Sequence, residues 1–280
     1  MPNEEEHSLT GVVIKFFSTA SSVGKTLISC NMASELARQG ARVVLCDLDL
    51  QFGDICNYLH LAPDQTIADA QRCIELQGTG FDVRECLAPY SYEDVAFSVL
   101  AAPKELAEAY NMKTETIRSM IESLQRSYDY VILDTTSMFS ELNVAMLDLS
   151  TIVTFLGVVD FIPTIKNMKI GFDMMNLLKY ETKMRVVLNR SNAKTRIAIQ
   201  DVEKLMGQQF YHILPNDFRA ATQSIQEGVP LVLRQKDIPL TTALRDLVAR
   251  YTNRAFTPDA DGDEAPAAHR KTSWFEKIFH

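Results

Sequence analysis

Residues 18–26, Ser-Thr-Ala-Ser-Ser-Val-Gly-Lys-Thr, have the composition and spacing of a loop that could hold phosphate groups. In such a loop the Lys25 ammonium reaches the β- and γ-phosphates of a nucleotide, and the Thr26 hydroxyl is a ligand of Mg²⁺. Backbone N–H groups at the start of the following helix cradle the phosphates. The residues predicted to contact a nucleotide here are Ser21, Ser22, Val23, Gly24, Lys25, Thr26 and Leu27.

This loop departs from the usual pattern G-x-x-x-x-G-K-[ST], because Thr19 occupies the first glycine position. The next residues, Ala20, Ser21 and Ser22, are small enough for an anion to approach the backbone. A Gly-Lys-Thr triplet by itself also occurs by chance in loops. An apolar strand-like run before the loop and a helical pattern after it favour nucleotide binding over that alternative.

Three carboxylates follow apolar runs elsewhere in the chain. Asp47 and Asp49 follow one run, and Asp134 ends another. In open parallel sheets, ligands bind at the carboxyl ends of the strands, and an aspartate at such a place commonly organises Mg²⁺. Each carboxylate alone could instead cap a helix or form a turn. Together with the loop they predict a metal site made of Thr26, Asp47, Asp49 and Asp134.

Apolar runs rich in β-branched residues alternate with helical patterns along the chain. The strands are expected at 11–17, 41–50, 95–103, 128–136, 151–159, 184–190 and 211–214. The helices are expected at 25–38, 114–127, 141–149, 163–180, 197–206, 217–227 and 239–255, with two short helices within 55–77. Strands without a polar face are typical of a sheet that is covered on both sides. The sequence therefore predicts an α/β fold with a mainly parallel central sheet flanked by helices.

The composition narrows the class of protein. The 280 residues carry a net charge of −8, and 46% of them are apolar. The acidic balance argues against nucleic acid as the main partner, because phosphate backbones require clustered positive charge. No apolar run approaches the roughly 20 residues of a membrane-spanning helix, and the acidic first ten residues do not resemble a signal peptide. Five cysteines without a C-x-x-C pair favour reduced thiols and a cytoplasmic location.

The ends of the chain differ in composition from its body. We expect an acidic leader at 1–10, one domain at 11–255, a flexible linker at 256–270 and a short amphipathic tail at 271–280. At about 100° per residue, the four large apolar residues of the tail fall within an arc of roughly 140°. They are Trp274, Phe275, Ile278 and Phe279. This pattern predicts a membrane-surface helix, with docking on a partner protein or on the protein's own core as alternatives.

Several segments together resemble a known family. They are GKT (24–26), VVLCDLDLQFGD (43–54), YDYVILDTT (128–136), VVLNR (186–190) and ILPNDFRAATQSIQEGVPL (213–231). Over about residues 11–254 the chain resembles the deviant-Walker ATPases of the ParA/MinD superfamily. The segments DLDLQFGD and PNDFRA are most similar to the TadZ/CpaE branch, the pilus-assembly and polar-localisation ATPases of Tad (Flp) pilus systems.

The resemblance implies a role for each matching residue. ATP and Mg²⁺ would be the cofactors, with Lys25 and Asp47 as catalytic residues and Asp47 handling the attacking water. Asp49 matches the second position of the same switch, and Asp134 matches the Walker B aspartate. The nucleotide-binding positions outside the phosphate loop are Asn189, which would recognise adenine, Arg190 beside it, and Pro215, Asn216 and Asp217, which would line the base.

The resemblance also implies partners. ATP would drive formation of a homodimer, and the partners would be proteins of a pilus or secretion machine. The tail would bring this cytoplasmic protein to the inner membrane, at a cell pole, as the tail of MinD-type relatives does. CpaE-like proteins often carry a receiver-like domain ahead of the ATPase, so this chain is a short form or a fragment.

One departure bears on catalysis. The family's signature lysine, which reaches the partner's nucleotide, is Ala20 in this sequence. Three functions compete: a slow ATPase that regulates position in the cell, a scaffold that binds ATP without turning it over, which Ala20 favours, and a P-loop phosphotransferase or ligase, such as a tyrosine kinase. The absence of a tyrosine cluster after Tyr251 argues against the kinase. A MinD/ParA-type regulator of another process is the alternative to the pilus role.

Overall fold

The computed structural model describes residues 11–78, 80–192, 197–235 and 237–253, and these build one eight-stranded sheet in the order β3-β4-β2-β5-β1-β6-β7-β8. The predicted leader (1–10), linker (256–270) and tail (271–280) lie outside the described residues. The strands are β1 (Val12–Phe17), β2 (Val43–Leu48), β3 (Ala88–Tyr92), β4 (Val95–Leu100), β5 (Tyr130–Thr135), β6 (Ile152–Gly157), β7 (Met184–Leu188) and β8 (His212–Ile213). All neighbouring strands are parallel except β3 and β4, so the predicted fold class is confirmed.

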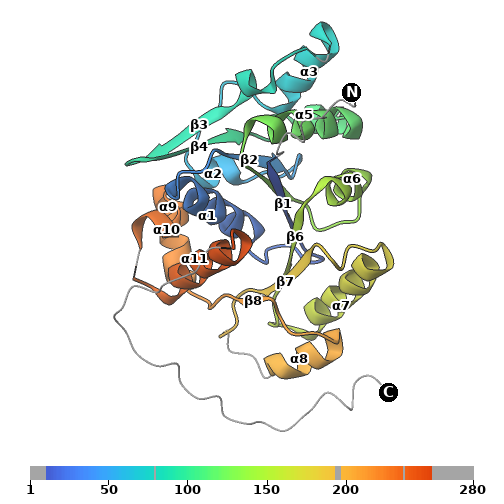
Figure 1. Ribbon diagram of the computed structural model, residues 1–280, viewed down its shortest axis with the longest axis vertical. Coiled ribbons are helices and arrows are strands. Elements are labelled where there is room, and N and C mark those ends of the chain that lie inside the picture. The colour runs from blue at the N-terminus through green and yellow to red at the C-terminus, as the bar shows by residue number, and fades with distance from the viewer. Residues whose placement is uncertain (1–10, 79, 193–196, 236, 254–280) are drawn as a thin grey trace, which may run out of the picture.

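Helices cover both faces of this sheet (Figure 1). One face carries α1 (Lys25–Arg38), α2 (Ile55–Tyr58), α9 (Phe218–Glu227), α10 (Leu231–Arg234) and α11 (Pro239–Tyr251). The other carries α3 (Ile67–Gln77), α5 (Thr114–Ser127), α6 (Glu141–Leu149), α7 (Ile162–Leu177) and α8 (Ile199–Met206). Short helices η1 (Val83–Cys86) and α4 (Leu106–Tyr110) complete the described part. None of the described helices is long and apolar enough to cross a membrane.

The sequence did not predict β3, and its prediction for the next strand was too long. Residues 88–92 read Ala-Pro-Tyr-Ser-Tyr, in which proline and serine hide the alternation of an edge strand. A two-residue turn at Glu93 and Asp94 joins β3 to β4 in an antiparallel hairpin. The strand expected at 95–103 ends at Leu100, and the helix expected at 239–255 ends at Tyr251.

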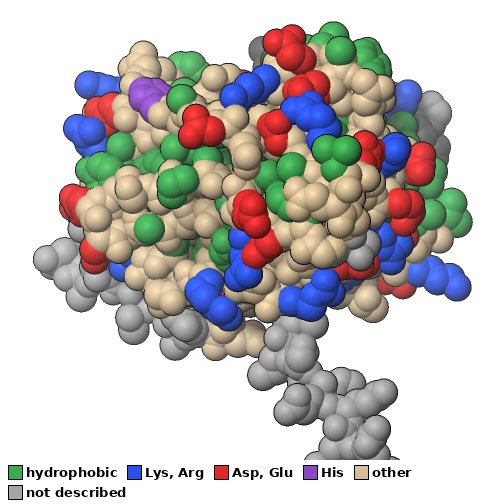
Figure 2. All heavy atoms as spheres, turned by 90° about the horizontal axis from the view of Figure 1, so that it is seen from above, with side chains coloured by type: hydrophobic (Ala, Val, Ile, Leu, Met, Phe, Trp, Pro, Cys, Tyr) green, Lys and Arg blue, Asp and Glu red, His purple; other side chains and the backbone are tan. Residues whose placement is uncertain are grey.

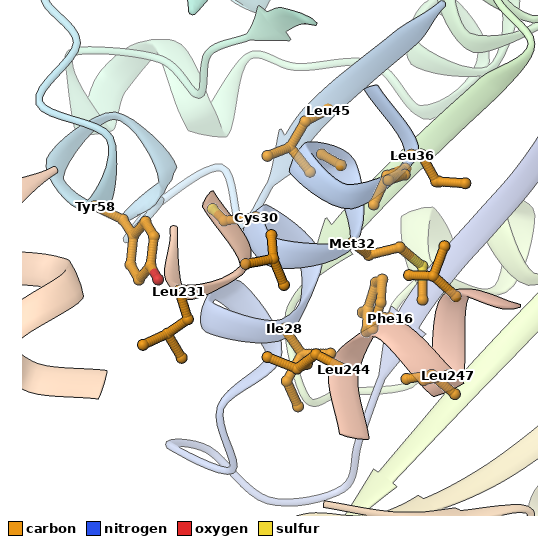
Figure 3. Close-up of a cluster of buried hydrophobic side chains, with 14 of the residues drawn as sticks. Phe16, Ile28, Cys30, Met32, Leu36, Leu45, Tyr58, Leu231, Leu244 and Leu247 are labelled. Carbon is orange, nitrogen blue, oxygen red and sulfur yellow. The ribbon is translucent and has the colours of Figure 1, made fainter. Parts of the chain in front are cut away.

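Helix α1 lies at the centre of one apolar core. Its Ile28, Met32 and Leu36 are at most 2% exposed and pack among apolar residues of the sheet, α10 and α11, as Figure 3 shows. The partners labelled there include Phe16, Leu45, Leu231, Leu244 and Leu247. Burial of one such side chain contributes about 1.5–3 kcal/mol. This packing holds the helix that follows the phosphate loop rigidly against the sheet.

The beginning of the phosphate loop is packed against α7. The Thr19 hydroxyl donates to the backbone carbonyl of Asn167 at 2.8 Å. A Cβ atom added to Gly171, one turn further along, would lie 2.2 Å from Thr19 Cγ2 and 3.2 Å from Phe155 Cζ. Glycine inside a helix costs about 1 kcal/mol relative to alanine, and here it allows the close approach of the loop. Thr19, at the first glycine position of the usual phosphate-loop pattern, therefore points its side chain at α7.

This contact predicts the effect of one substitution. Gly171→Ala should lower the free energy of unfolding by about 1–3 kcal/mol, although alanine favours helix, because the new methyl group overlaps Thr19. Chemical denaturation of the wild type and the variant measures the difference. Adding Thr19→Ser removes Cγ2 and should recover most of the loss. Equal stability of the wild type and Gly171→Ala would contradict the prediction.

Candidate functional site

The phosphate loop joins the carboxyl end of β1 to the first residue of α1, as its sequence predicts. Two of its residues have left-handed backbone conformations, Ser22 with φ 56° and Gly24 with φ 95°. A Cβ atom at Gly24 would lie 2.6 Å from the Asn189 amide nitrogen, so no larger residue fits there. These conformations turn the chain sharply before α1 and leave the start of that helix facing the cavity described below.

Lys25 is the first side chain of α1 and lies on the wall of this cavity. Its ammonium donates to the Ser137 hydroxyl at 2.9 Å and lies 3.5 Å from the Ser18 hydroxyl. Burial lowers the pKa of Lys25, and the charges of Asp134 and Asp49 partly oppose that shift. An ammonium held by neutral hydroxyl groups can exchange them for phosphate oxygens, which bind it more strongly.

Thr26 and Asp134 lie side by side at the bottom of the site. The Thr26 hydroxyl donates to Asp134 Oδ2 at 2.6 Å, and Asp134 Oδ1 is buried without a hydrogen-bond partner among the described residues. Burial raises the pKa of Asp134 to about 6. An unpaired buried carboxylate oxygen next to a hydroxyl is a donor set that suits Mg²⁺, which prefers oxygen ligands.

Asp47 lies behind the wall of the cavity and not on it. Its Oδ2 accepts from the backbone N–H of Ile55 at 3.1 Å, and its Oδ1 accepts from that of Asp49 at 3.3 Å. Burial and the charge of Asp134 raise the pKa of Asp47 well above its usual range. A Cβ atom at Gly53 would lie 2.5 Å from Asp47 Oδ2, so this glycine lets the loop close over the carboxylate.

Asp49 is partly exposed and lines the cavity, where it accepts from the backbone N–H of Phe52 at 3.3 Å. Within the described ranges, no three His, Cys, Asp or Glu side chains lie close enough to hold a metal ion by themselves. Mg²⁺ usually keeps several waters and is bound through one or two carboxylates and substrate phosphates. Thr26, Asp134 and Asp49 are compatible with that kind of site, whereas both oxygens of Asp47 already accept from backbone N–H groups.

Asn189 and Arg190 tie the end of β7 to the phosphate loop. The Asn189 amide donates to the carbonyl of Val23 at 2.9 Å, and its oxygen accepts from the backbone N–H of Arg190. The Arg190 guanidinium donates to the carbonyl of Ser22 at 2.8 Å. Both side chains line the cavity as well, so two residues far from the loop in sequence close one side of it.

The segment before α9 forms a further part of the wall. Pro215, Asn216 and Asp217 line the cavity. Asp217 Oδ1 accepts from the backbone N–H of Ala220 at 2.9 Å and caps α9. The carboxylate therefore has the structural role of a helix cap, and its place on the wall follows from where α9 begins.

All these segments surround one cavity of about 940 Å³. Of the predicted residues, Val23, Asp47 and Asp134 lie behind its wall. The sequence did not point to several other residues of the wall, among them Gln51, Asn57, Tyr58, Thr136, Ser137 and Thr222. Ser137 follows Asp134 by three residues, and that spacing was the one signal that could have found it.

Exposed apolar side chains surround the opening of the cavity. Phe52 and Phe218 are each 75% exposed, Met138 is 64% exposed and Ile225 is 44% exposed. All four also line the cavity, and they come from three separate segments, since Phe218 and Ile225 both belong to α9. We call this set the apolar rim. Large apolar residues gathered at one exposed place are typical of an interaction surface.

Comparison with known proteins agrees with this geometry. Residues 14–231 match the family described as CobQ/CobB/MinD/ParA nucleotide binding domain. The putative septum site-determining protein MinD of Mesostigma viride is 24% identical over 264 residues, which are 88% of this chain and 87% of that protein. The family match includes the phosphate loop and all three carboxylates.

Two solved structures share the fold. MinD in the MinC:MinD cell division protein complex of Aquifex aeolicus superposes with a TM-score of 0.73 and 18% identity, over 90% of this chain and 100% of that one. MinD of Pyrococcus horikoshii, complexed with Mg-ADP, superposes with a TM-score of 0.72 and 16% identity, over 86% of this chain and 96% of that one. The family match spans most of the chain, and the chain belongs to the CobQ/CobB/MinD/ParA family of nucleotide-binding domains.

Proposed function

We propose that this protein binds ATP with Mg²⁺ in the cavity and works as a nucleotide-dependent dimer that localises or assembles a larger machine. The observation that carries the proposal lies at the bottom of the cavity. There an ammonium held by hydroxyl groups, Lys25, lies near a Thr26–Asp134 pair with an unpaired carboxylate oxygen. The first group suits phosphate and the second suits Mg²⁺.

Different residues of the site would bind the phosphates and the metal ion. Lys25 would exchange Ser137 and Ser18 for phosphate oxygens, and Thr26 and Asp134 would hold the metal with Asp49 nearby. Mg²⁺, when bound, would neutralise charge on the phosphates. Asp47 is held by two backbone N–H groups and would act on water only after the loop above it moves.

Hydrolysis by this protein is proposed to be slow. Ala20 replaces the signature lysine, and its backbone carbonyl accepts from the hydroxyls of Ser18 and Ser137. A positive side chain on the transferring phosphoryl group is worth about 10³–10⁵ in rate in other systems, and Ala20 cannot supply one. A scaffold that binds ATP and does not turn it over is therefore the close alternative.

The proposed dimer would bury the apolar rim around two nucleotides. Association would remove Phe52, Met138, Phe218 and Ile225 from water. Burial of these large apolar side chains would contribute favourable free energy to the dimer. On the face drawn in Figure 2, Lys and Arg side chains are interspersed with Asp and Glu and do not form one patch. That distribution and the net charge of −8 support a protein partner over nucleic acid.

The machine that we propose is a Tad (Flp) pilus or secretion system, with the protein placed at a pole on the inner face of the membrane. The support is the similarity of DLDLQFGD and PNDFRA to the TadZ/CpaE branch. A MinD/ParA-type regulator of another process is the second candidate, and the septum site-determining relative favours it. Identifying the proteins that co-purify with the ATP-bound protein from its own cells tests the two against each other.

Removal of the lysine tests nucleotide binding directly. Lys25→Ala should weaken ATP binding by at least about 2 kcal/mol, roughly 30-fold in Kd, because a charge-assisted contact to phosphate is lost. Calorimetry with Mg²⁺ and ATP measures the change. Lys104→Ala is the matched control, since the Lys104 ammonium contacts the carbonyl of Asp64 outside the cavity. Equal affinity of wild type and Lys25→Ala would refute the proposed site.

The rate of phosphate release tests the proposal that ATP hydrolysis is slow. Phosphate release by the purified protein should stay below about one per second, and Ala20→Lys should raise it by at least about tenfold, because it restores the positive group. The same measurement in Asp47→Asn subtracts release from contaminants. Faster release by the wild type that disappears in Asp47→Asn would mean that another group replaces the lysine.

The predicted tail has its own test. The full chain should sediment with anionic liposomes when ATP is present, because a dimer presents two weak membrane-binding segments at once. A chain that ends at Ala268 should remain in the supernatant. Trp274→Ala, on the apolar face of the predicted helix, should weaken sedimentation. Glu276→Ala, on its polar face, should not. If the full chain stays in the supernatant under all conditions, the tail binds something other than membrane.

A further inference from the structure

Lys15 is a charged side chain in the middle of the sheet. It belongs to β1, pairs in register with Leu133 and Val153 on the two neighbouring strands, and has no exposed surface. Its strand neighbours Ile14 and Phe16 belong to the core that contains α1. Lys15 therefore points to the opposite face, toward α6. Burial and the charge of Lys25 lower its pKa well below the usual range.

The Lys15 nitrogen donates to Oδ1 of Asn143 at 2.7 Å. The amide nitrogen of Asn143 faces the other way and donates to Thr136 Oγ1 at 2.7 Å and to the carbonyl of Met138 at 2.6 Å. A backbone carbonyl only accepts, so this amide must present its nitrogen to the 136–138 loop. Its oxygen then faces the core and needs a donor, because an unpaired buried acceptor is costly. Lys15 is that donor.

The 136–138 loop connects this pair to the phosphate loop. The Ser137 hydroxyl donates to the carbonyl of Ala20 at 2.8 Å and accepts from the Lys25 ammonium at 2.9 Å. Ser137 is held on one side by these contacts, while Asn143 holds the residues on either side of it. Hydrogen bonds from Lys15 to Asn143 and from Asn143 to the loop, followed by the backbone of the loop, thus connect Lys15 to the contact between Ser137 and Lys25.

Apolar packing of the core does not require a lysine at this position. A buried amine loses its hydration, and an apolar side chain of the same length would fill the space without that loss. Replacing buried ionic groups with apolar residues of similar volume is often neutral or stabilising. What an apolar residue cannot do is donate to Asn143 and so orient its amide.

We propose that Lys15 is a positioning residue of the nucleotide site, which acts through Asn143 to hold the 136–138 loop where Ser137 meets Lys25. The proposal rests on the proposed function, since the consequence that matters is nucleotide affinity. Lys15 and Asn143 themselves are absent from the wall of the cavity. Their effect on nucleotide binding must therefore pass through the loop.

The experiment compares two substitutions of nearly equal length. Lys15→Met removes the donor, and Lys15→Gln keeps one. Val13→Ala is the matched control, because Val13 is equally buried on the same face of the same strand but belongs to the apolar core. Two measurements are made on each. They are the side-chain amide NMR signal of Asn143 without nucleotide, assigned by its loss in Asn143→Leu, and the affinity for ATP with Mg²⁺.

We expect Lys15→Met to move the Asn143 signal toward that of a free amide and to weaken ATP binding by about three- to tenfold, the effect of one lost buried hydrogen bond. Lys15→Gln should change the Asn143 signal and the ATP affinity less than Lys15→Met does. Val13→Ala should change neither. In an Asn143→Leu background, Lys15→Met should cause no further loss of affinity, because Lys15 acts through Asn143.

An unchanged Asn143 signal in Lys15→Met overturns the proposal, and so does an equal loss of affinity in Val13→Ala. If Lys15→Met does not fold, Lys15→Gln and Asn143→Leu decide. The proposal then requires weaker binding in Asn143→Leu than in Lys15→Gln, and the reverse order overturns it. A wild type that binds no ATP refutes the proposed function, while the NMR signal, measured without nucleotide, still decides whether Lys15 orients Asn143.

Discussion

The burial of α1 against the sheet is the interaction on which the rest of the structure depends. Its apolar residues pack on β1 and β2 beneath α10 and α11. Asn31 adds polar contacts, since its oxygen accepts from the backbone N–H of Val232 and its nitrogen donates to the carbonyl of Leu27 and the hydroxyl of Tyr58. Because these contacts hold α1 against the sheet, they also position its first residues, Lys25 and Thr26, relative to the strand ends.

A few buried ionisable side chains near the site destabilise the fold, because burial removes their hydration. Asp47, Asp134 and Lys15 have almost no exposed surface, and burial opposes the charged form of each. Unpaired or half-paired buried groups destabilise a protein unless a ligand or network satisfies them. Asp134 has an unpaired oxygen at the place where we propose that Mg²⁺ binds, Asp47 accepts from two backbone N–H groups behind it, and the lysine donates to Asn143. Each costly group is thus linked to the proposed site.

Membership of a nucleotide-binding family leaves the biological role open, because the same fold serves many processes. The features that bear on the role lie around the cavity. Ala20 removes a charge, Thr19 packs on α7, and the apolar rim offers a surface that a partner could cover. These residues, and not the sheet, are where a role in turnover, dimer formation or assembly would be decided.

The sequence alone determined the strand–loop–helix unit around Lys25, the mainly parallel sheet and the placement of three carboxylates at strand ends. These features depend on local periodicity and on short spacings, which a single sequence contains. Strand β3 escaped notice because an edge strand with proline and serine lacks the apolar pattern of a buried one.

Only the tertiary structure decided that Asp47 lies behind the cavity wall, that Ser137 contacts Lys25, and that Lys15 meets Asn143. The partners in the last two pairs are separated by 112 and 128 positions along the chain. Contacts of this kind exist because β1, β5 and β6 are neighbours in the sheet. That neighbourhood is a product of strand order, and strand order is set by the packing of the whole chain and not by the residues near each strand.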